Sequence, residues 1–363
     1  MAKVYLQTYG CQQNKADGEQ LAGLLHQSGN VLVNNLYEAD TVIVNTCAVK
    51  LKTQNKELHF IKNIPKDKQI IVGGCLTKVI DVRKHVGNVD ALFDTNSITK
   101  INDIIENPRD TFRSIHENKI NIPRIRLNKE IGILPIEEGC LSNCSFCGTK
   151  LARGNLTSYR IGDIKRELES AVKDGCKKIY LTGQDTGCYG FDIGTNLPEL
   201  LEELVTIPGN YKIRVGMANP WHIIKILPRL IEAYKSDKIV KFIHIPVQSG
   251  SEKVTRDMRR IHTVEEFKKI VSAFRKEFPG ITISTDIIIG YPEEDLQDFE
   301  DTIRLIEETK PEVLNISKYS AMHGTKASKL KQLPSQEIKR RSEILTRVYQ
   351  EIKAKGEISL QVN

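Results

Sequence analysis

Six short apolar segments alternate with amphipathic segments of helix length between residues 131 and 320. The strand-like segments are IGILPIEEG, KKIYLTGQD, YKIRVGMAN, KFIHIPVQ, ITISTDIIIG and EVLNISKYS. The segments between them, such as VEEFKKIVSAFRKEF and LQDFEDTIRLIEET, repeat apolar residues at the spacing of one helix face. Such a series predicts parallel strands joined by crossover helices, and a partial (βα)6 barrel fits it.

Glycine and polar residues follow several of these predicted strands, where parallel barrels build their binding sites. The candidates for holding a cofactor are Gly183, Gln184, Asp185, Gln248, Ser249, Gly250, Asp286 and Tyr319. The alternative is that these residues only form the turns between strands and helices. His244 alternates with apolar neighbours on a strand, so we interpret it as a packed histidine and not as a catalyst.

A group of three cysteines opens this region in the stretch EEGCLSNCSFC. Cys140, Cys144 and Cys147 have a C-x3-C-x2-C spacing, and no fourth cysteine or histidine follows nearby. Structural zinc takes four protein ligands, so it would need a distant residue to complete the site. An iron–sulfur cluster with three cysteine ligands keeps one iron open for another molecule, which makes the cluster a reaction centre. The spacing therefore favours an iron–sulfur cluster.

A second set of three cysteines lies in the first hundred residues. Cys11, Cys47 and Cys75 each stand at a turn after an apolar run, in VYLQTYGC, TVIVNTC and QIIVGGC. They are roughly thirty residues apart, which is the length of a βαβ unit. In a doubly wound, flavodoxin-like sheet the carboxyl ends of such strands lie side by side. The pattern predicts a second three-cysteine cluster, with buried and inert thiols as the alternative.

Composition sets wider limits. The chain has 363 residues, 40% of them hydrophobic, which suffices for two or three domains. Its net charge of +7 permits a polyanionic partner without requiring one. No signal peptide and no long apolar run is present, so we expect a cytoplasmic chain without a membrane partner. Thiols are kept reduced there, which argues against disulfides; Cys176 and Cys188 show no metal spacing and are predicted to be structural or incidental.

The C-x3-C-x2-C stretch, with Phe146 before its last cysteine, resembles the signature of radical S-adenosylmethionine (SAM) enzymes. The resemblance implies a [4Fe–4S] cluster on Cys140, Cys144 and Cys147 whose open iron is chelated by SAM. Reductive cleavage of SAM then releases a 5′-deoxyadenosyl radical. Phe146 joins the candidates for SAM binding on the same ground.

Nearly the whole chain is similar to the methylthiotransferases within that superfamily. The motifs that carry the similarity include TYGCQQNKADGE, NTCAVK, HIPVQSGSEKVTRDMRR, TDIIIGYPEEDLQDFEDT and KYSAMHGTKAS. The resemblance implies a second [4Fe–4S] cluster on Cys11, Cys47 and Cys75, and SAM as both methyl donor and radical source. An electron donor and a sulfur source are implied as partners.

Three stretches resemble the archaeal and eukaryotic branch of that family, which acts on tRNA. They are CGTKLARGNLTSY, in which Lys150 replaces a proline common in bacterial relatives, TGQDTGCYGFDIGTNLPELL and RVGMANPWHI. The resemblance implies conversion of N6-threonylcarbamoyladenosine (A37), beside the anticodon, to its 2-methylthio derivative. The alternatives are isopentenyladenosine tRNA or a ribosomal protein as substrate, or a non-catalytic iron–sulfur RNA-binding protein. A cobalamin-dependent methyltransferase would share this fold, but the chain has no D-x-H-x-x-G stretch.

We predict four parts along the chain. These are an N-terminal three-cysteine domain at 1–107, a basic linker at 108–129, the radical SAM barrel at 130–334, and a C-terminal helix with the start of the missing TRAM region at 335–363. The linker is interpreted as a solvated connector, with phosphate binding as the alternative; its basic residues are Arg109, Arg113, Lys119, Arg124, Arg126 and Lys129. The C-terminal helix is interpreted as a salt-bridged surface helix. Relatives continue into a β-rich TRAM module, which we expect to be absent because the chain stops at Asn363.

Overall fold

The computed structural model describes residues 1–356, which form two compact units. The first unit comprises Met1–Cys140, Cys147–Gln184 and Met322–Gly324. The second unit comprises Leu141–Phe146, Asp185–Ala321 and the chain from Thr325 onward. These units follow contacts within the fold, whereas the predicted domain boundaries follow motifs and stay predictions. Residues 357–363, at the expected start of the TRAM region, lie outside the described residues.

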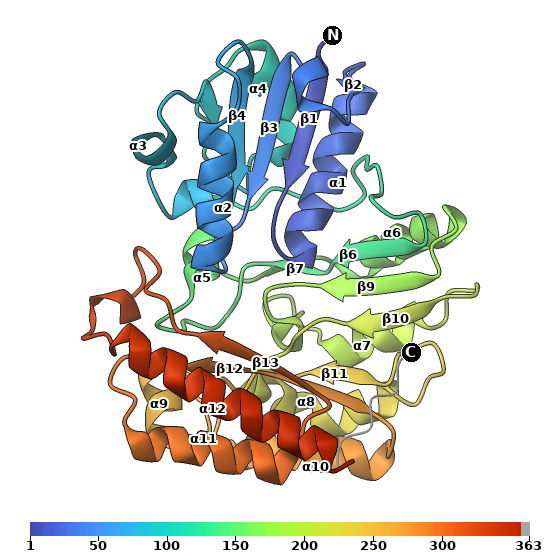
Figure 1. Ribbon diagram of the computed structural model, residues 1–363. Coiled ribbons are helices and arrows are strands. Elements are labelled where there is room, and N and C mark those ends of the chain that lie inside the picture. The colour runs from blue at the N-terminus through green and yellow to red at the C-terminus, as the bar shows by residue number, and fades with distance from the viewer. Residues whose placement is uncertain (357–363) are drawn as a thin grey trace. The chain divides into compact units, whose positions relative to one another are not determined.

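A five-stranded parallel sheet forms the centre of the first unit (Figure 1). Its strands, in the order β2-β1-β3-β4-β5, are β2 (Val31–Leu32), β1 (Lys3–Thr8), β3 (Thr41–Thr46), β4 (Gln69–Gly74) and β5 (Ala91–Leu92). Val4 is in register with Thr41, and Thr41 with Gln69. The central strand β3 is buried along its whole length, as expected for a strand covered on both faces.

Helices cover both faces of this sheet. On one face, α1 (Gln12–Gln27) and α4 (Ile101–Glu106) pack through Leu21, Leu25 and Ile101 onto Ile43 and Ile71. On the other face, α2 (Leu51–Lys62) and α3 (Val82–Val86) pack onto the alternate residues of β3 and β4. Because successive strand side chains point to opposite faces, two separate cores form. The predicted doubly wound arrangement is confirmed.

The first unit continues with two further strand pairs. The strand β6 (Ile131–Pro135) pairs in parallel with β9 (Lys178–Thr182), and α6 (Ile161–Lys173) connects them. The short strands β7 (Glu137–Glu138) and β8 (Thr157–Ser158) pair antiparallel around α5 (Gly148–Arg153). The strand β7 ends two residues before Cys140, and α5 begins directly after Cys147. Regular secondary structure therefore lies on both sides of the C-x3-C-x2-C stretch.

The second unit contains the remaining predicted strands. A parallel sheet has the order β11 (Phe242–His244), β12 (Thr282–Ile289) and β13 (Val313–Lys318). The strand β10 (Lys212–Val215) precedes them, with a parallel bridge from Ile213 to Ile239. All six strand-like segments of the sequence therefore contain strands, and each is followed by helix.

The second unit contains a further set of helices, and two of them begin with a capping box. They are α7 (Leu197–Leu204), α8 (Pro220–Ala233), α9 (Glu252–Asp257), α10 (Val264–Glu277), α11 (Leu296–Thr309) and α12 (Ser335–Ala354). Thr263 with Glu266, and Asp295 with Asp298, form capping boxes that satisfy the first free N–H groups of α10 and α11. Single turns of 3₁₀-helix connect other elements: η1 (Leu36–Glu38), η2 (Leu76–Lys78), η3 (Ile98–Lys100), η4 (Thr186–Cys188) and η5 (Ala327–Lys329).

The interpretation of the C-terminal helix needs a correction at Arg341. Its side chain is 7% exposed, and Nη1 donates to the carboxylate of Glu294 at 2.9 Å. It also donates to the backbone carbonyl of Asp295 at 2.9 Å, so Arg341 fastens α12 to the start of α11. Exposed pairs such as Arg340 with Glu337 do match the expected surface helix. Helical spacing alone did not distinguish the buried arginine from its neighbours.

The predicted linker is not simply a solvated connector. Lys119 is 2% exposed, and the side chains of Arg124 and Arg126 are each 7% exposed. Arg124 lies in an ion pair with Glu167, and it donates to the carbonyl of Ile133 at 2.8 Å. The linker packs into the first unit because buried acidic groups there offer partners to its cations. Its other basic residues, Arg109, Arg113 and Lys129, are exposed.

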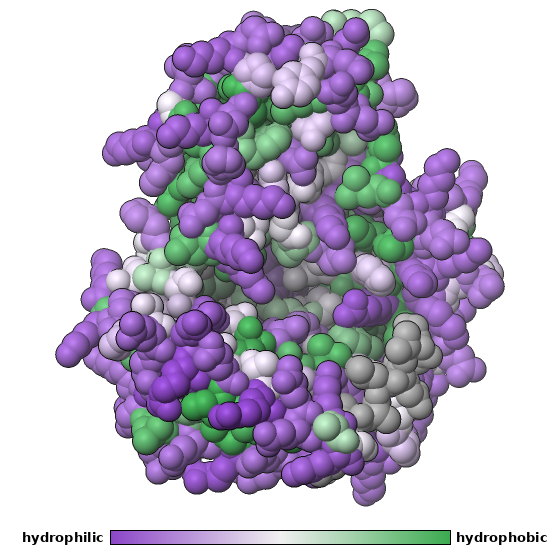
Figure 2. Space-filling view, viewed as in Figure 1, coloured by the Kyte–Doolittle hydropathy of each residue, from purple (hydrophilic) through white to green (hydrophobic). Residues whose placement is uncertain are grey.

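In the view of Figure 2 the surface is largely hydrophilic, with apolar side chains scattered over it. None of the helices in residues 1–356 combines the length and apolarity needed to cross a bilayer.

Candidate functional site

The first unit brings Cys11, Cys47 and Cys75 to the same edge of its sheet. They follow β1, β3 and β4, which are neighbours in the sheet. Cys11 is exposed and stands directly before α1, while Cys47 and Cys75 are both 2% exposed. The carboxyl ends of neighbouring parallel strands lie side by side, and residues that are far apart in the chain therefore converge there.

Gly10 makes room for this convergence. It has a positive φ of 99°, and a Cβ there would lie 2.6 Å from Cys47 Sγ. Only glycine combines that backbone conformation with so close an approach. The turn before Cys11 is therefore shaped around the second cysteine of the set.

The three thiols share one electrostatic environment. Burial, together with the charges of Cys11 and Cys75, raises the pKa of Cys47 to about 12. Burial likewise raises the pKa of Cys75, to about 11, while the guanidinium of Arg153 opposes the rise. Three thiolates in this place need compensating positive charge, which a metal centre supplies. The donor set fits an iron–sulfur cluster.

Arg153 is a residue that the sequence reasoning missed. It is fully buried at the end of α5, and its Nε donates to Cys75 Sγ at 3.3 Å. Its Nη1 donates to Glu138 at 2.8 Å and its Nη2 to Asp17 at 2.5 Å. The sequence shows only that this arginine, in LARG, lies six residues after Cys147. Nothing in the neighbouring residues indicates that its side chain is buried.

The C-x3-C-x2-C cysteines are divided between the units, so each is described within its own. In the first unit, Cys147 precedes α5, and its Sγ accepts a hydrogen bond from Lys150 N at 3.4 Å. Burial raises the pKa of Cys147, with a further rise from the charge of Cys140. In the second unit, Arg260 Nη1 lies 3.8 Å from Cys144 Sγ as a donor.

The short stretch around Cys144 is anchored in the second unit. Ser145 N donates to Met258 O at 3.0 Å, and the Ser145 and Tyr291 hydroxyls are hydrogen-bonded at 2.8 Å. Phe146 packs against a buried cluster that contains Tyr291 and Tyr319. Two predicted SAM-binding residues, Phe146 and Tyr319, thus belong to one apolar cluster beside Cys144.

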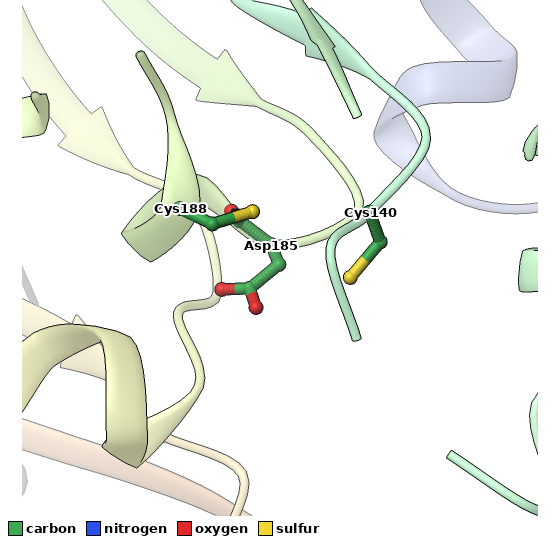
Figure 3. Close-up of side chains that lie close together, drawn as sticks. All are labelled: Cys140, Asp185 and Cys188. Carbon is green, nitrogen blue, oxygen red and sulfur yellow. Dashed lines mark hydrogen bonds between the residues drawn. The ribbon is translucent and has the colours of Figure 1, made fainter. Parts of the chain in front are cut away.

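Asp185 is the centre of a buried polar group in the second unit. Its carboxylate accepts hydrogen bonds from His222 Nδ1 at 2.7 Å and from Asn219 Nδ2 at 2.5 Å. Arg260 Nη2 donates to Asn219 Oδ1 at 2.6 Å, which continues the group towards Cys144. Figure 3 shows Asp185 beside Cys188, whose Sγ donates to the Asp185 carbonyl at 3.2 Å. Asn219, His222 and Arg260 were not among the predicted site residues.

The other predicted cofactor residues differ in what they offer. Buried Oε1 atoms of Gln184 and Gln248 accept no hydrogen bond from any residue in 1–356. Gln248 also has a positive φ of 74°, a strained conformation typical of functional positions. Asp286, in contrast, already accepts from His244 Nε2 at 2.9 Å and from Asn315 at 2.8 Å. His244 is therefore a hydrogen-bonded and partly exposed histidine, and its interpretation as a packed residue that is not a catalyst stays a prediction.

Gly183, Ser249 and Gly250 contact the protein itself. A Cβ on Gly183 would lie 2.5 Å from Glu137 Oε1, and one on Gly250 would lie 2.5 Å from Asp301 O. Gly250 N donates to Thr302 Oγ1 at 2.9 Å, and the Ser249 and Thr302 hydroxyls are hydrogen-bonded at 3.3 Å. These contacts give the three residues packing roles, and their part in cofactor binding stays a prediction.

Two protein-family models match parts of this chain. Residues 134–306 match the model of the radical SAM superfamily, and residues 3–94 match the model of the uncharacterized protein family UPF0004. The solved structure of the radical SAM methyltransferase TsrM from Kitasatospora setae covers 90% of this chain and 77% of its own, with a TM-score of 0.66. At 15% identity this shows the fold alone. The predicted fold class is confirmed, and the chain is a radical SAM enzyme.

Sequence relatives define the family more closely. The probable threonylcarbamoyladenosine tRNA methylthiotransferase of Pyrococcus horikoshii is 44% identical over 361 residues, which is 96% of this chain and 84% of the relative. The human threonylcarbamoyladenosine tRNA methylthiotransferase is 36% identical, covering 96% of this chain and 62% of its own. This chain belongs to the threonylcarbamoyladenosine tRNA methylthiotransferase family. Membership implies SAM and a [4Fe–4S] cluster as cofactors.

Proposed function

We propose that this chain converts N6-threonylcarbamoyladenosine at position 37 of tRNA to its 2-methylthio derivative. The observation that carries the proposal is the sequence identity of 44% along 96% of the chain with the probable threonylcarbamoyladenosine tRNA methylthiotransferase of Pyrococcus horikoshii. Relatives in archaea and in vertebrates carry the same activity in their names.

The six cysteines are the proposed ligands of two [4Fe–4S] clusters. Cys140, Cys144 and Cys147 would hold the cluster that binds SAM, and the other set would hold the second cluster. Convergence of Cys11, Cys47 and Cys75, with the space left by Gly10, supports the second cluster. The proposed SAM contacts are Phe146, Gly183, Gln184, Asp185, Gln248, Ser249, Gly250, Asp286 and Tyr319. Among them, the unbonded oxygens of Gln184 and Gln248 favour a polar ligand most directly.

When bound, the clusters and SAM supply the one-electron chemistry needed to replace the unreactive hydrogen on adenine C2, which side-chain bases cannot remove. The residues of the chain provide the setting. Burial of Cys47 and Cys75 excludes water from the thiolates. Anchoring of Ser145 by Met258 and Tyr291 fixes the backbone next to Cys144.

An electron donor and a sulfur source are the remaining proposed partners, and the cytoplasm is the proposed location because tRNA is the proposed substrate. We also retain 1–107, 108–129, 130–334 and 335–363 as proposed domains, with the linker packed into the first unit.

Product analysis tests the reaction. The anaerobically reconstituted chain is incubated with SAM, sulfide, a reductant and tRNA that carries threonylcarbamoyladenosine, and the nucleosides are identified by mass spectrometry. We expect the 2-methylthio nucleoside, and none from matched tRNA without the threonylcarbamoyl group. Product from isopentenyladenosine tRNA alone would assign a different substrate. Formation of 5′-deoxyadenosine excludes a non-catalytic role.

Iron counting tests the two clusters. We expect near eight irons per chain, falling to about four when Cys11, Cys47 and Cys75 are all replaced by alanine. About four irons in both proteins would contradict the second cluster.

A further inference from the structure

A buried charge network in the first unit touches the N-terminal cysteines. It consists of Asp17, Lys119, Glu138 and Arg153, all no more than 2% exposed. Lys119 Nζ lies 2.9 Å from Asp17 and 2.6 Å from Glu138, so each carboxylate is shared by both cations. The network has two positive and two negative side chains. Each cation pairs with both carboxylates, and all four side chains are buried from solvent.

Arg153 also donates a hydrogen bond from Nε to a partner outside the charge network. The pairing of the two cations with the two carboxylates does not require this bond. Nη1 and Nη2 of Arg153 are occupied by Glu138 and Asp17, and its Nε points to Cys75 Sγ at 3.3 Å. Asn14 Oδ1 accepts from Arg153 Nη2 at 3.1 Å and lies 3.9 Å from the same sulfur. The planar guanidinium is thus held at three corners with one N–H aimed at a thiol.

The remaining partners keep this geometry rigid. Gln13 Nε2 donates to Glu138 at 2.7 Å, and Asn14 Nδ2 donates to the carbonyls of Tyr9 and Thr46, at 2.6 and 3.0 Å. These backbone groups belong to the turns that lead to Cys11 and Cys47. Burial would lower the pKa of Lys119, but Asp17 and Glu138 hold that pKa above its usual range, so the network stays charged.

We propose that Arg153 is a positioning residue for the N-terminal cluster, which stabilises the cluster's reduced state by donating a hydrogen bond from Nε to the Cys75 thiolate. A donor to a cluster sulfur and a fixed positive charge both favour the form with the additional electron. Arg153 lies six residues after Cys147, so the peptide that carries one proposed cluster also adjusts the other. The inference rests on the proposed second cluster.

The test uses a chain whose only cluster is the N-terminal one, obtained by replacing Cys140, Cys144 and Cys147 with alanine. Its cluster is titrated with dithionite at measured solution potentials, and the amount of reduced cluster is followed by electron paramagnetic resonance. The quantity obtained is a reduction potential and not an activity. Arg153→Met is expected to make reduction at least tenfold less favourable, a shift of about 59 mV to lower potential for one electron.

Arg124→Met is the matched control. Arg124 is also a buried arginine of the first unit with acidic partners, Glu19 and Glu167, and it contacts none of the three cysteines in the described hydrogen bonds. We expect this variant to be less stable but to keep the wild-type potential. An equal shift in both variants would overturn the inference, because it would show a general effect of lost packing.

A neutral version of the network covers the case in which Arg153→Met does not fold. The double variant Arg153→Met, Asp17→Asn removes one cation and one anion together, and it is compared with Asp17→Asn alone. A lower potential in the double variant supports the inference, and an equal potential refutes it. Absence of iron from the chain before any Arg153 substitution would instead refute the second cluster itself.

Discussion

At the scale of single residues, the decisive features are close approaches that sequence patterns do not display. Gly10 stands in a turn where a side chain would meet Cys47, and Arg153 fills a space between two carboxylates and a thiol. His262 is 2% exposed and stacks on Trp221 with ring centroids 5.6 Å apart. The role of each residue depends on the contacts that surround it. The same substitution at a position without those contacts is therefore a suitable control.

Gly10→Ala is expected to destabilise the first unit and to prevent assembly of the N-terminal cluster. The positive φ costs about 1–2 kcal/mol for alanine, and overpacking against Cys47 adds about 1–3 kcal/mol. Gly29→Ala is the control, because Gly29 also has a positive φ, of 83°, but a Cβ there meets nothing within 4 Å. Urea unfolding and iron content should separate the variants. Equal iron content in both would show that Cys47 needs no such space.

His262 should make stability fall in acid. Burial, with the nearby charge of Arg260, lowers the pKa of His262 to about 3. Between about pH 6.5 and 3 the unfolded chain therefore binds the proton that the folded chain excludes, and stability is lost as pH falls through this range. One such group accounts for about 2 kcal/mol between pH 7.5 and 5.

His262→Gln should remove this contribution, seen as a smaller loss of unfolding free energy in urea between pH 7.5 and 5. His85→Gln, at an exposed histidine, should leave the loss as in the wild type. An unchanged loss in His262→Gln would show that His262 is not the responsible group.

At the scale of elements, the linker and α1 are fitted to one another. Gly23 lies within α1, and a Cβ there would collide with the backbone of Pro123 and Arg124. Ile125 N donates to Glu19 O at 2.9 Å, and Gln20 donates to Lys119 O at 2.7 Å. The segment that composition marks as a basic connector is thus part of the packed surface of α1.

Gly23→Ala is expected to destabilise the chain by about 1–3 kcal/mol, although alanine is the better helix former by about 1 kcal/mol. The control is Gly162→Ala in α6, where a Cβ meets nothing within 4 Å. That variant should be neutral or more stable by up to about 1 kcal/mol. Urea midpoints of the unloaded chain provide the measurement. A higher urea midpoint for Gly23→Ala would mean that the linker can move away from α1 without a loss of unfolding free energy.

At the scale of the whole molecule, two cysteine sets predict two separable losses of activity. Cys144→Ala should abolish 5′-deoxyadenosine formation, because the proposed SAM-binding cluster loses a ligand. Cys47→Ala should keep 5′-deoxyadenosine formation and lose the methylthiolated nucleoside. Both products are measured in the same anaerobic reaction with tRNA. Normal methylthiolation by Cys47→Ala would remove the second cluster from the proposal, and normal SAM cleavage by Cys144→Ala would relocate the first.

The sequence alone determined the α/β class, the six predicted strand segments after residue 130 and the two sets of cysteines; it missed the short strand β8. It could do so because strand and helix periods are local and because C-x3-C-x2-C is contiguous. Likewise, strands one βαβ unit apart meet at one sheet edge by a general rule, which was enough to predict that Cys11, Cys47 and Cys75 converge.

Only the tertiary structure decided where the buried charges go. Lys119, Arg124 and Arg341 look like surface cations in sequence, yet each lies against carboxylates that come from other elements. Arg153 reaches Cys75 across 78 positions of the chain, and Asp185 gathers His222 and Asn219 from the next strand–helix unit. A charged side chain is buried only when partners surround it in space, and that condition has no period or spacing along the chain.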